Sequence, residues 1–367
     1  MITFNDKRIL VTGSCGTVGS ELVRQLLSGK DFNPKQVIGI DNNESDLFFQ
    51  EQDYVSDPRA NFFLADLRDT DKLIHDTRDV DIIFHTAALK HVVMCERSPM
   101  EAVQTNIHGV QNIIDAANRN QVEKVIFTSS DKAVNPTNVM GTSKLMGERL
   151  ITAANSSKRG KGPLFASTRF GNVLGSRGSV LPIFRRQIAA GGPLTVTDTE
   201  MTRFVMSIEQ SVRLVIESAE IAKGGEVFIT KMPVLRIIDL AEVMIEELAP
   251  MYGRDPKDIS INIIGSKPGE KLYEELMSDE ETRRSIELKQ YFAVMPAFRG
   301  LYNDIDYSYE DEVTREVNDA YNSSLQPVMS KTEIKDFLNK LNLLGEDTST
   351  DEATSRYWPG DKEGKSS

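Results

Sequence analysis

Short apolar runs rich in β-branched residues recur through the first part of the chain, and longer amphipathic stretches separate them. Six runs have the length of buried strands: RILVT at 8–12, QVIGI at 36–40, FFLA at 62–65, DIIFH at 81–85, KVIFTS at 124–129 and FASTRF at 165–170. Alternating strands and helices are typical of a parallel sheet that helices cover on both faces. The pattern therefore predicts the α/β class, with a Rossmann doubly wound parallel sheet.

The pattern loosens after Phe170, where loops containing glycine and proline interrupt the chain. Amphipathic spacing predicts helices near 208–222 and 237–248. Ser330 and Glu333 are spaced as a capping box, which predicts that a last helix begins there.

These boundaries divide the chain into parts. We expect residues 1–170 to form a dinucleotide-binding Rossmann domain. Residues 171–344 are expected to form mainly a smaller C-terminal substrate-binding lobe, partly interleaved with the Rossmann sheet. Residues 345–367 are polar and poor in apolar side chains, so we expect a disordered tail.

Composition narrows the classes of function. The chain has 367 residues, with 55 acidic and 43 basic side chains and a formal net charge of −12, which argues against nucleic acid or an anionic membrane as partner. Two cysteines, Cys15 and Cys95, and four histidines suggest neither disulfides nor a metal site. No apolar stretch has the length of a signal peptide or a membrane span, so we expect a cytoplasmic protein.

The segment VTGSCGTVG follows the first predicted strand and opens the first helix. Gly13, Gly16 and Gly19 permit a tight turn and a close approach of backbone to a pyrophosphate, with Thr17 and Val18 at the helix N-terminus. The alternative interpretation is an ordinary strand-to-helix turn. Because the motif lies between a strand and a helix, we favour dinucleotide binding.

Asp41 ends the second predicted strand, twenty-two residues after Gly19. A carboxylate there accepts the ribose hydroxyls of NAD and repels the 2′-phosphate of NADP, so NAD is the expected cofactor. Asp66, followed by Leu67, is placed after the third strand to contact the adenine, although a helix N-cap looks the same in sequence. We also assign Ala87, after the fourth strand, to the cofactor.

The stretch DKAVNPTNVMGTSK at 131–144 has the acidic residue, proline turn and final lysine of a nicotinamide-enzyme active site. In the common Tyr-x-x-x-Lys pattern a tyrosine precedes that lysine by four positions, but here the position holds Met140. A thioether cannot take a proton from an alcohol. A methionine on a helix is more often a packing residue than a reacting one.

Seven segments in order carry a resemblance: VTGSCGTVG, HTAALKHV, TNIHGVQNII, SSDKAVNPTNVMGTSK, RFGNVLGSRGSVLP, TDTEMTRF and KPGEKLYEEL. Over about residues 5–290 the chain resembles the extended short-chain dehydrogenase/reductases. More narrowly, it is similar to the UDP-N-acetylglucosamine 4,6-dehydratases that invert C5 and serve surface-glycan or nonulosonic-acid synthesis.

The resemblance implies an internal redox cycle with NAD. A hydride leaves C4 of the sugar, water is lost across C5 and C6, and the hydride returns to C6. By resemblance Lys132 is the base at C5, Asp131 is the acid that assists loss of the 6-hydroxyl, and Ser130 hydrogen-bonds O4. Lys144 holds the nicotinamide ribose. An amine is a base at neutral pH only when its pKa is lowered, and we expect burial beside the positively charged nicotinamide of the cofactor to do this for Lys132.

The resemblance also implies a UDP-hexosamine substrate and a homo-oligomer. The residues assigned to the substrate are Lys90, Asn172, Arg177, Arg203, Lys267 and Glu270. Cations are needed there because the diphosphate is anionic and the chain is acidic. For the charged residues the alternative interpretation is a solvated surface, and for the Asp131–Lys132 pair it is a surface salt bridge.

Because Met140 stands where the tyrosine is expected, the sequence does not fix the final product of the reaction. Two branches that resemble this chain also carry methionine: one still makes the 4-keto-6-deoxy sugar, and the other returns the hydride to C4 and releases a 5,6-ene sugar. Lys132, Asp131 or a bound water then takes the C4 proton. A UDP-sugar 4-epimerase and a non-catalytic nucleotide-sugar binder are further alternatives, although a binder has no use for an acid–base pair at the sugar.

Overall fold

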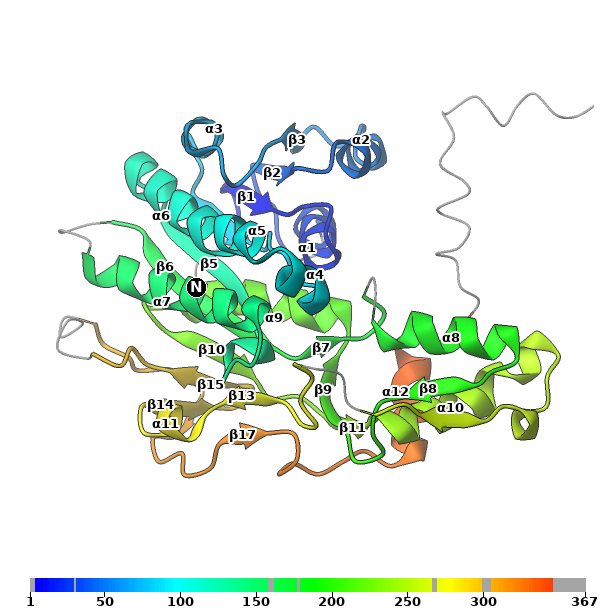
Figure 1. Ribbon diagram of the computed structural model, residues 1–367. Coiled ribbons are helices and arrows are strands. Elements are labelled where there is room, and N and C mark those ends of the chain that lie inside the picture. The colour runs from blue at the N-terminus through cyan, green and yellow to red at the C-terminus, as the bar shows by residue number, and fades with distance from the viewer. Residues whose placement is uncertain are drawn as a thin grey trace, which may run out of the picture.

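A ten-stranded sheet runs through the computed structural model, which describes residues 4–29, 31–157, 162–176, 179–265, 269–298 and 305–345 (Figure 1). Its first six strands are β1 Arg8–Thr12, β2 Gln36–Asp41, β3 Ala60–Leu64, β4 Ile82–His85, β5 Lys124–Ser130 and β6 Leu164–Phe170. They pair in parallel in the order β3-β2-β1-β4-β5-β6. The predicted Rossmann sheet is confirmed.

The central strands are apolar along their length because helices cover both of their faces. All four residues of β4 are buried, as are the first six of β5. On one face α1 Thr17–Leu27 packs against α9 Ile208–Ile221, which also contacts β5 and β6. The helices of the other face are α3 Thr70–Asp76, α6 Gly109–Asn120 and α7 Val139–Ser157. Further helices near the sheet are α2 Glu44–Asp53, α4 Val92–Arg97 and α5 Pro99–Val103.

The second half of the chain extends this sheet. β10 Val227–Thr230 pairs in parallel with β6, and antiparallel partners follow in the order β15 Tyr291–Val294, β14 Ser285–Leu288 and β16 Glu312–Thr314. The pattern of apolar runs did not predict these added strands. The division at residue 170 stays a prediction.

A smaller lobe lies beside the sheet, at the right of Figure 1. Its elements are α8 Val180–Ala190, β8 Leu194–Val196, α10 Ile237–Leu248, β12 Ile261–Ile263 and α12 Lys331–Lys340, which share one apolar core. The predicted helices near 208–222 and 237–248 are confirmed. Ser330 caps α12 in a capping box with Glu333, also as predicted.

Short strands between sheet and lobe carry residues of the site described below. A three-stranded sheet contains β7 Asn172–Val173, β9 Thr202–Met206 and β11 Val234–Arg236. β13 Glu275–Met277 pairs with β17 Tyr321–Asn322 in a separate antiparallel sheet, and α11 Asp279–Thr282 follows β13.

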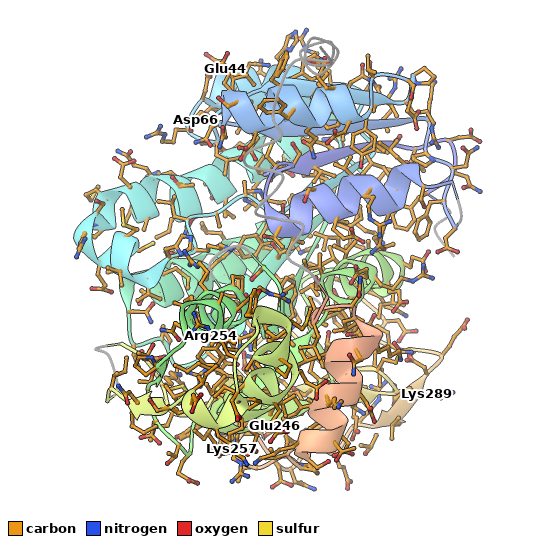
Figure 2. All side chains as sticks on the ribbon, turned by 90° about the vertical axis from the view of Figure 1, so that its right-hand side faces the viewer. Glu44, Asp66, Glu246, Arg254, Lys257 and Lys289 are labelled. Carbon is orange, nitrogen blue, oxygen red and sulfur yellow. The ribbon has the colours of Figure 1, made fainter. Side chains whose placement is uncertain are left out.

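Charged side chains cover the outer surface, including the labelled Glu44 of α2, Glu246 of α10 and Lys257 of the lobe (Figure 2). Among the described residues, none of the helices is long and apolar enough to cross a bilayer. The same residues contain no group of histidine, cysteine and carboxylate side chains arranged to hold a metal ion.

Candidate active site

The glycine loop forms one wall of a long groove. The loop leaves β1 and enters α1, whose N-cap is Gly16. The groove has a volume of about 580 Å³ and passes the carboxyl ends of the central strands. The predicted cofactor residues that line it are Gly13, Gly16, Thr17, Val18, Gly19, Asp41, Asp66, Leu67, Ala87 and Lys144. The structure therefore brings this whole set together.

Two of the glycines are required by close contacts. Gly13 has a φ of 68°, and a Cβ there would lie 2.7 Å from the Ala87 Cα. A Cβ on Gly19 would lie 2.0 Å from the carbonyl oxygen of Gly13. Only glycine lets the helix N-terminus, the loop and the end of β4 approach this closely. The resulting cradle fits a dinucleotide pyrophosphate.

Asp41 is held at the end of β2 beside this cradle. Its carboxylate accepts the Cys15 backbone amide at 3.1 Å and the Asn43 amide at 3.0 Å. These bonds fix an acceptor in the groove where a ribose hydroxyl would bind and a 2′-phosphate would be repelled. The residues therefore fit a dinucleotide with free ribose hydroxyls.

Asp66 lines the outer end of the groove and lies near the surface (Figure 2). The Arg68 guanidinium donates to its carboxylate at 2.6 Å, and this hydrogen bond lowers the pKa of Asp66. The N-cap of α3 is Asp69, so the interpretation of Asp66 as a helix cap is wrong.

Helix α7 presents Met140 and Lys144 to the groove. The Lys144 ammonium donates to the Thr128 carbonyl at 2.9 Å and lies 4.6 Å from the centre of the Phe127 ring. Burial lowers the pKa of Lys144 to about 8. Met140 is buried in a small apolar cluster with Cys95 and Ala102, as a packing residue would be.

The predicted catalytic turn, Asp131–Ala133, follows β5. Ser130 caps it, its Oγ accepting the Lys132 amide at 3.1 Å. The Lys132 Nζ lies 2.9 Å from Asp131 Oδ2. Asp131 is buried, the Lys132 side chain is 34% exposed, and both residues line the groove and the cavity beside it.

The pKa of Lys132 is set by opposing effects. Burial acts to lower it, but the carboxylates of Asp131 and Glu274 outweigh burial, and the net pKa is raised. The protein's own groups therefore raise the pKa of Lys132, and the lowering expected beside a bound nicotinamide stays a prediction.

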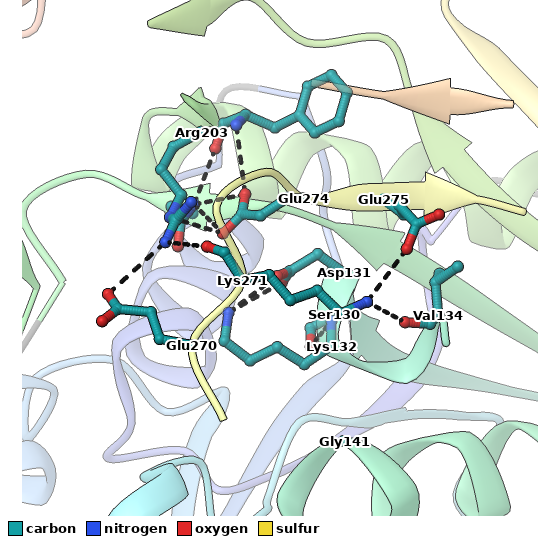
Figure 3. A network of polar contacts seen from close by, with 12 residues as sticks. Ser130, Asp131, Lys132, Val134, Gly141, Arg203, Glu270, Lys271, Glu274 and Glu275 are labelled. Carbon is teal, nitrogen blue, oxygen red and sulfur yellow. Dashed lines mark hydrogen bonds and ion pairs between the residues drawn. The ribbon is translucent and has the colours of Figure 1, made fainter. Parts of the chain in front are cut away.

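Opposite the turn, a second polar group surrounds Glu274 (Figure 3). Asn172 donates its amide to both carboxylate oxygens of Glu274 at 2.8 Å, and Arg203 Nε lies 3.3 Å from Oε1. A second nitrogen of Arg203 lies 3.7 Å from Glu270. Burial and the nearby Asp131 raise the pKa of Glu274 to about 7, against the opposing effect of Arg203.

Three cavities meet at these residues. The groove shares Asp131, Lys132 and Asn172 with a cavity of about 300 Å³ that Arg203, Glu270 and Glu274 also line. A third cavity of about 260 Å³ continues from Asn172, Arg203 and Glu270 into the apolar core of the lobe. The arrangement suits an extended ligand with a polar middle, lying beside a dinucleotide.

The predicted substrate residues are only partly placed. Lys90 lines the groove, and Asn172, Arg203 and Glu270 line the joined cavities. Arg177 and Lys267 lie outside the described residues, as do residues 346–367 of the predicted tail.

Sequence analysis missed Glu274 and Asn106. Asn106 lies in the π-helical segment Gln104–His108, and its amide donates to Ser143 Oγ at 2.9 Å and to the Leu89 carbonyl at 3.0 Å. It thereby ties the loop after β4 to α7. A π-helical segment is common at functional sites, but no periodicity in the sequence announces it.

Comparisons with known proteins agree with this geometry. The profile of the family described as polysaccharide biosynthesis protein matches residues 9–296. An uncharacterised membrane protein of Methanocaldococcus jannaschii is 48% identical over 93% of this chain and 98% of its own. An inverting UDP-N-acetylglucosamine 4,6-dehydratase of Campylobacter jejuni is 39% identical over 92% and 98%. A UDP-glucose 4-epimerase of Rickettsia canadensis is 36% identical over 94% and 98%.

Solved structures show the same fold. The X-ray structure of Pen from Bacillus thuringiensis superposes with a TM-score of 0.85 at 41% identity, covering 94% of this chain and 99% of that one. The dTDP-glucose 4,6-dehydratase DesIV of Streptomyces venezuelae, solved with NAD bound, gives a TM-score of 0.63 at 25% identity, covering 72% and 86%.

Proposed function

This chain belongs to the polysaccharide biosynthesis family of nucleotide-sugar-modifying short-chain dehydrogenase/reductases, and from that premise we propose that it is a UDP-N-acetylglucosamine 4,6-dehydratase. The observation that supports the proposal best is the Asp131–Lys132 pair, which lies where the dinucleotide groove meets a second polar cavity. A simple nucleotide-sugar binder has no need of an acid–base pair at this point.

NAD fits the glycine cradle and Asp41, and when bound it supplies the hydride acceptor for C4 and the hydride donor for C6. Lys144 holds the nicotinamide ribose and adds positive potential. Lys132 removes the C5 proton, which the C4 ketone makes acidic, and Asp131 protonates the departing 6-hydroxyl. Ser130 hydrogen-bonds O4, and Lys132, Asp131 or a water takes the C4 proton.

The substrate's nucleotide half occupies the joined cavities. Arg203 and Glu270 lie at the junction between the polar cavity and the apolar one. Arg203 faces the diphosphate, Glu270 the uridine ribose and Asn172 the phosphate. We propose that Lys90, Arg177 and Lys267 also contact the substrate.

A second candidate product is the 5,6-ene sugar, formed when the hydride returns to C4 instead of C6. Met140 is compatible with either product, because methionine at this position occurs in both branches that the chain resembles. The 36% identical epimerase keeps 4-epimerisation as a further candidate. A cytoplasmic location and a homo-oligomeric state also belong to the proposal.

The decisive experiment incubates wild type with UDP-N-acetylglucosamine and NAD in deuterated water. Proton NMR and mass spectrometry distinguish a 4-ketone with a C6 methyl group from a 5,6-ene with olefinic protons. The proposal expects the 4-keto-6-deoxy product with deuterium at C5. Lys132→Ala is expected to abolish C5 exchange while leaving UDP binding nearly intact. If the wild-type protein eliminates water from none of the UDP-hexosamines tested, the dehydratase proposal is wrong.

Cofactor choice is tested separately with Asp41→Ala. The variant is expected to lose most of the preference for NAD over NADP, because the carboxylate that repels the 2′-phosphate is gone. Titrations of both dinucleotides, followed by intrinsic fluorescence, measure the preference. If the ratio of the two dissociation constants is the same as in wild type, Asp41 does not select the cofactor.

A further inference from the structure

Residues 269–275 lie against residues 131–138, and members of both segments line the polar cavity. The second of these segments begins with Asp131 and Lys132. Where the two segments meet, Val134 and Lys271 are 137 positions apart in the sequence, so only tertiary contacts set their relative position. These contacts therefore decide where Asp131 and Lys132 lie relative to a ligand in the cavity.

The Lys271 side chain binds the end of the predicted catalytic turn (Figure 3). Its Nζ donates to the Val134 carbonyl at 3.0 Å and to Glu275 Oε2 at 3.2 Å. Glu275 Oε1 in turn accepts the side-chain amide of Asn135 at 3.2 Å. The ion pair of Lys271 and Glu275 therefore holds the two residues that directly follow Ala133.

The chain needs such support at Asn135. Its φ is 43°, in the left-handed region that residues other than glycine rarely adopt. A proline follows, which restricts the backbone of Asn135 further. A strained conformation of this kind persists only when surrounding contacts hold it. Lys271 and Glu275 supply contacts on both sides of the peptide bond that precedes Asn135.

The backbone of Lys271 faces the other side of the cavity. Its carbonyl accepts a hydrogen bond from Arg203 Nη2 at 3.0 Å. The next carbonyl, that of Leu272, accepts one from Arg203 Nη1 at 3.2 Å and one from the Thr202 amide at 3.0 Å. Lys271 thus contacts the end of the predicted catalytic turn through its ammonium and Arg203 through its carbonyl.

We propose that Lys271 is a positioning residue that fixes the turn containing Asp131 and Lys132 relative to Arg203. The inference rests on the proposed function, in which Asp131 and Lys132 act on the sugar and Arg203 faces the diphosphate. Covalent bonds limit the separation between the reacting carbons and the diphosphate, so the protein groups that meet these two parts must keep a matching separation. A residue that contacts both groups maintains it.

Direct binding of phosphate by Lys271 is the alternative. Its ammonium already has a carbonyl and a carboxylate as partners, and the Glu275 carboxylate balances its charge. Arg203 lines both the polar cavity and the apolar cavity of the lobe, where the nucleotide is proposed to lie. The geometry therefore favours a positioning role for Lys271.

The test measures turnover and UDP binding in Lys271→Met. Methionine keeps an apolar stem of similar length and the backbone carbonyl that Arg203 binds, and it removes both bonds of the ammonium. We expect kcat with UDP-N-acetylglucosamine to fall by roughly 10²-fold while the dissociation constant of UDP changes by less than about threefold. A loss of UDP affinity as large as the loss of turnover would show that Lys271 binds the phosphate directly, and the inference would be wrong.

Lys271→Arg and Lys231→Met are the matched controls. Arginine can donate to a carbonyl and a carboxylate together, so Lys271→Arg should recover most of the lost turnover. Lys231 also forms an ion pair, with Glu287 at 2.6 Å, and its exposure of 29% is close to the 24% of Lys271. It directly follows β10, outside the segments that line the polar cavity. Lys231→Met should therefore keep wild-type turnover. Turnover in Lys271→Arg as slow as in Lys271→Met would overturn the inference.

Hydrogen exchange without substrate separates this inference from the proposed function. The Val134 amide is bonded within the turn, to the Asp131 carbonyl at 3.1 Å. In Lys271→Met we expect peptides that cover this segment to exchange at least about threefold faster than in wild type, whereas Lys231→Met should leave them unchanged. Unchanged exchange in Lys271→Met would contradict the positioning role even if wild type is an active dehydratase. Faster exchange in a protein whose wild type eliminates no water would instead contradict the proposed function alone.

Discussion

Two arginines in this structure each lie between two glutamates, yet the two clusters behave differently. Arg169 of β6 is bound by Glu148 of α7 at 2.7 Å and by Glu281 of α11 at 3.1 Å. Arg203 of β9 lies 3.3 Å from Glu274 and 3.7 Å from Glu270. The first cluster is sealed in the protein interior, and the second lines a cavity.

In the Arg169 cluster each carboxylate receives hydrogen bonds from the guanidinium at both oxygens. Burial alone would raise the pKa of Glu281, but Arg169 outweighs burial and lowers it to about 2. The Glu281 carboxylate therefore stays charged. A buried cation with two saturated partners is a structural joint between α7, β6 and α11.

In the Arg203 cluster the guanidinium is shared. It also donates to the backbone carbonyls of Thr202 at 2.8 Å, Lys271 at 3.0 Å and Leu272 at 3.2 Å, whereas Arg169 donates to one carbonyl, that of Leu276, so less of the Arg203 guanidinium binds Glu274. Asp131 adds a negative charge nearby. The same residue types therefore yield a carboxylate that can change its protonation state. An ion pair between arginine and glutamate indicates a reactive group only when the arginine does not fully balance the charge of the carboxylate and the carboxylate lines a cavity.

Replacing each arginine by methionine is the strongest test of this contrast. Arg169→Met leaves two buried carboxylates without their cation and is expected to lower the free energy of unfolding by about 3–5 kcal/mol. Arg203→Met should cost roughly 1–2 kcal/mol, because its partners reach a cavity that water can enter. Urea unfolding at neutral pH measures both values.

The ligand affinities should show the reverse order. Arg203→Met is expected to weaken UDP binding by roughly tenfold or more, since the cation proposed to face the diphosphate is lost. Arg169→Met, where it still folds, should bind UDP like wild type. Equal losses of stability in the two variants would show that the clusters are not different in kind.

The two carboxylates should also have opposite effects on stability as pH changes. The pKa of Glu281 is lowered from 4.5 to about 2, so its contribution is present above pH 4.5 and is lost as the pH falls toward 2. The pKa of Glu274 is raised from 4.5 to about 7, so its contribution is present below pH 4.5 and is lost as the pH rises toward 7.

Urea unfolding across that pH range, for wild type, Glu281→Gln and Glu274→Gln, measures these contributions. The stability advantage of wild type over Glu281→Gln should shrink toward acid, because Gln resembles a protonated glutamate. Glu274→Gln should resemble wild type in acid and become more stable than wild type toward neutral pH. Parallel curves for the two variants would remove the distinction between the clusters.

The sequence predicts the parts of the molecule that depend on local pattern. The first six strands are continuous apolar runs, and the glycine loop lies between a strand and a helix, so both are recognisable without long-range information. Asp131, Lys132 and Lys144 are recognisable for the same reason, because they lie in one short segment after a predicted strand.

Glu274 and Arg169 could not be predicted in this way. Glu274 meets Asn172 across 102 positions of the chain, and Arg169 meets Glu281 across 112. Both glutamates lie in short polar segments of the second half, where no periodicity shows which side chain points inward. Their roles depend on how the segment with β13 and α11 folds back over β6 and the turn after β5. No local pattern in the sequence indicates that contact.

Helix α7 connects the groove to the Arg169 cluster, since Met140 and Lys144 line the groove and Glu148, further along the same helix, binds Arg169. Met140→Tyr tests whether its active-site end lacks only a phenol. Burial and the nearby ammonium of Lys144 would act on a tyrosine hydroxyl there, with the charge lowering its pKa. We expect a loss of stability of only roughly 1 kcal/mol, from a larger ring in a packed cluster.

If oxidation at C4 limits the rate, that hydroxyl should speed turnover of UDP-N-acetylglucosamine, because general-base assistance is worth roughly 10²–10⁴-fold when the geometry is right. Met140→Phe is the matched control, since it adds the ring without the hydroxyl. Initial rates and product NMR for the two variants measure the effect of the hydroxyl alone. Identical rates would mean that the site already has its base at O4, and Met140 would then be a packing residue that the chemistry does not miss.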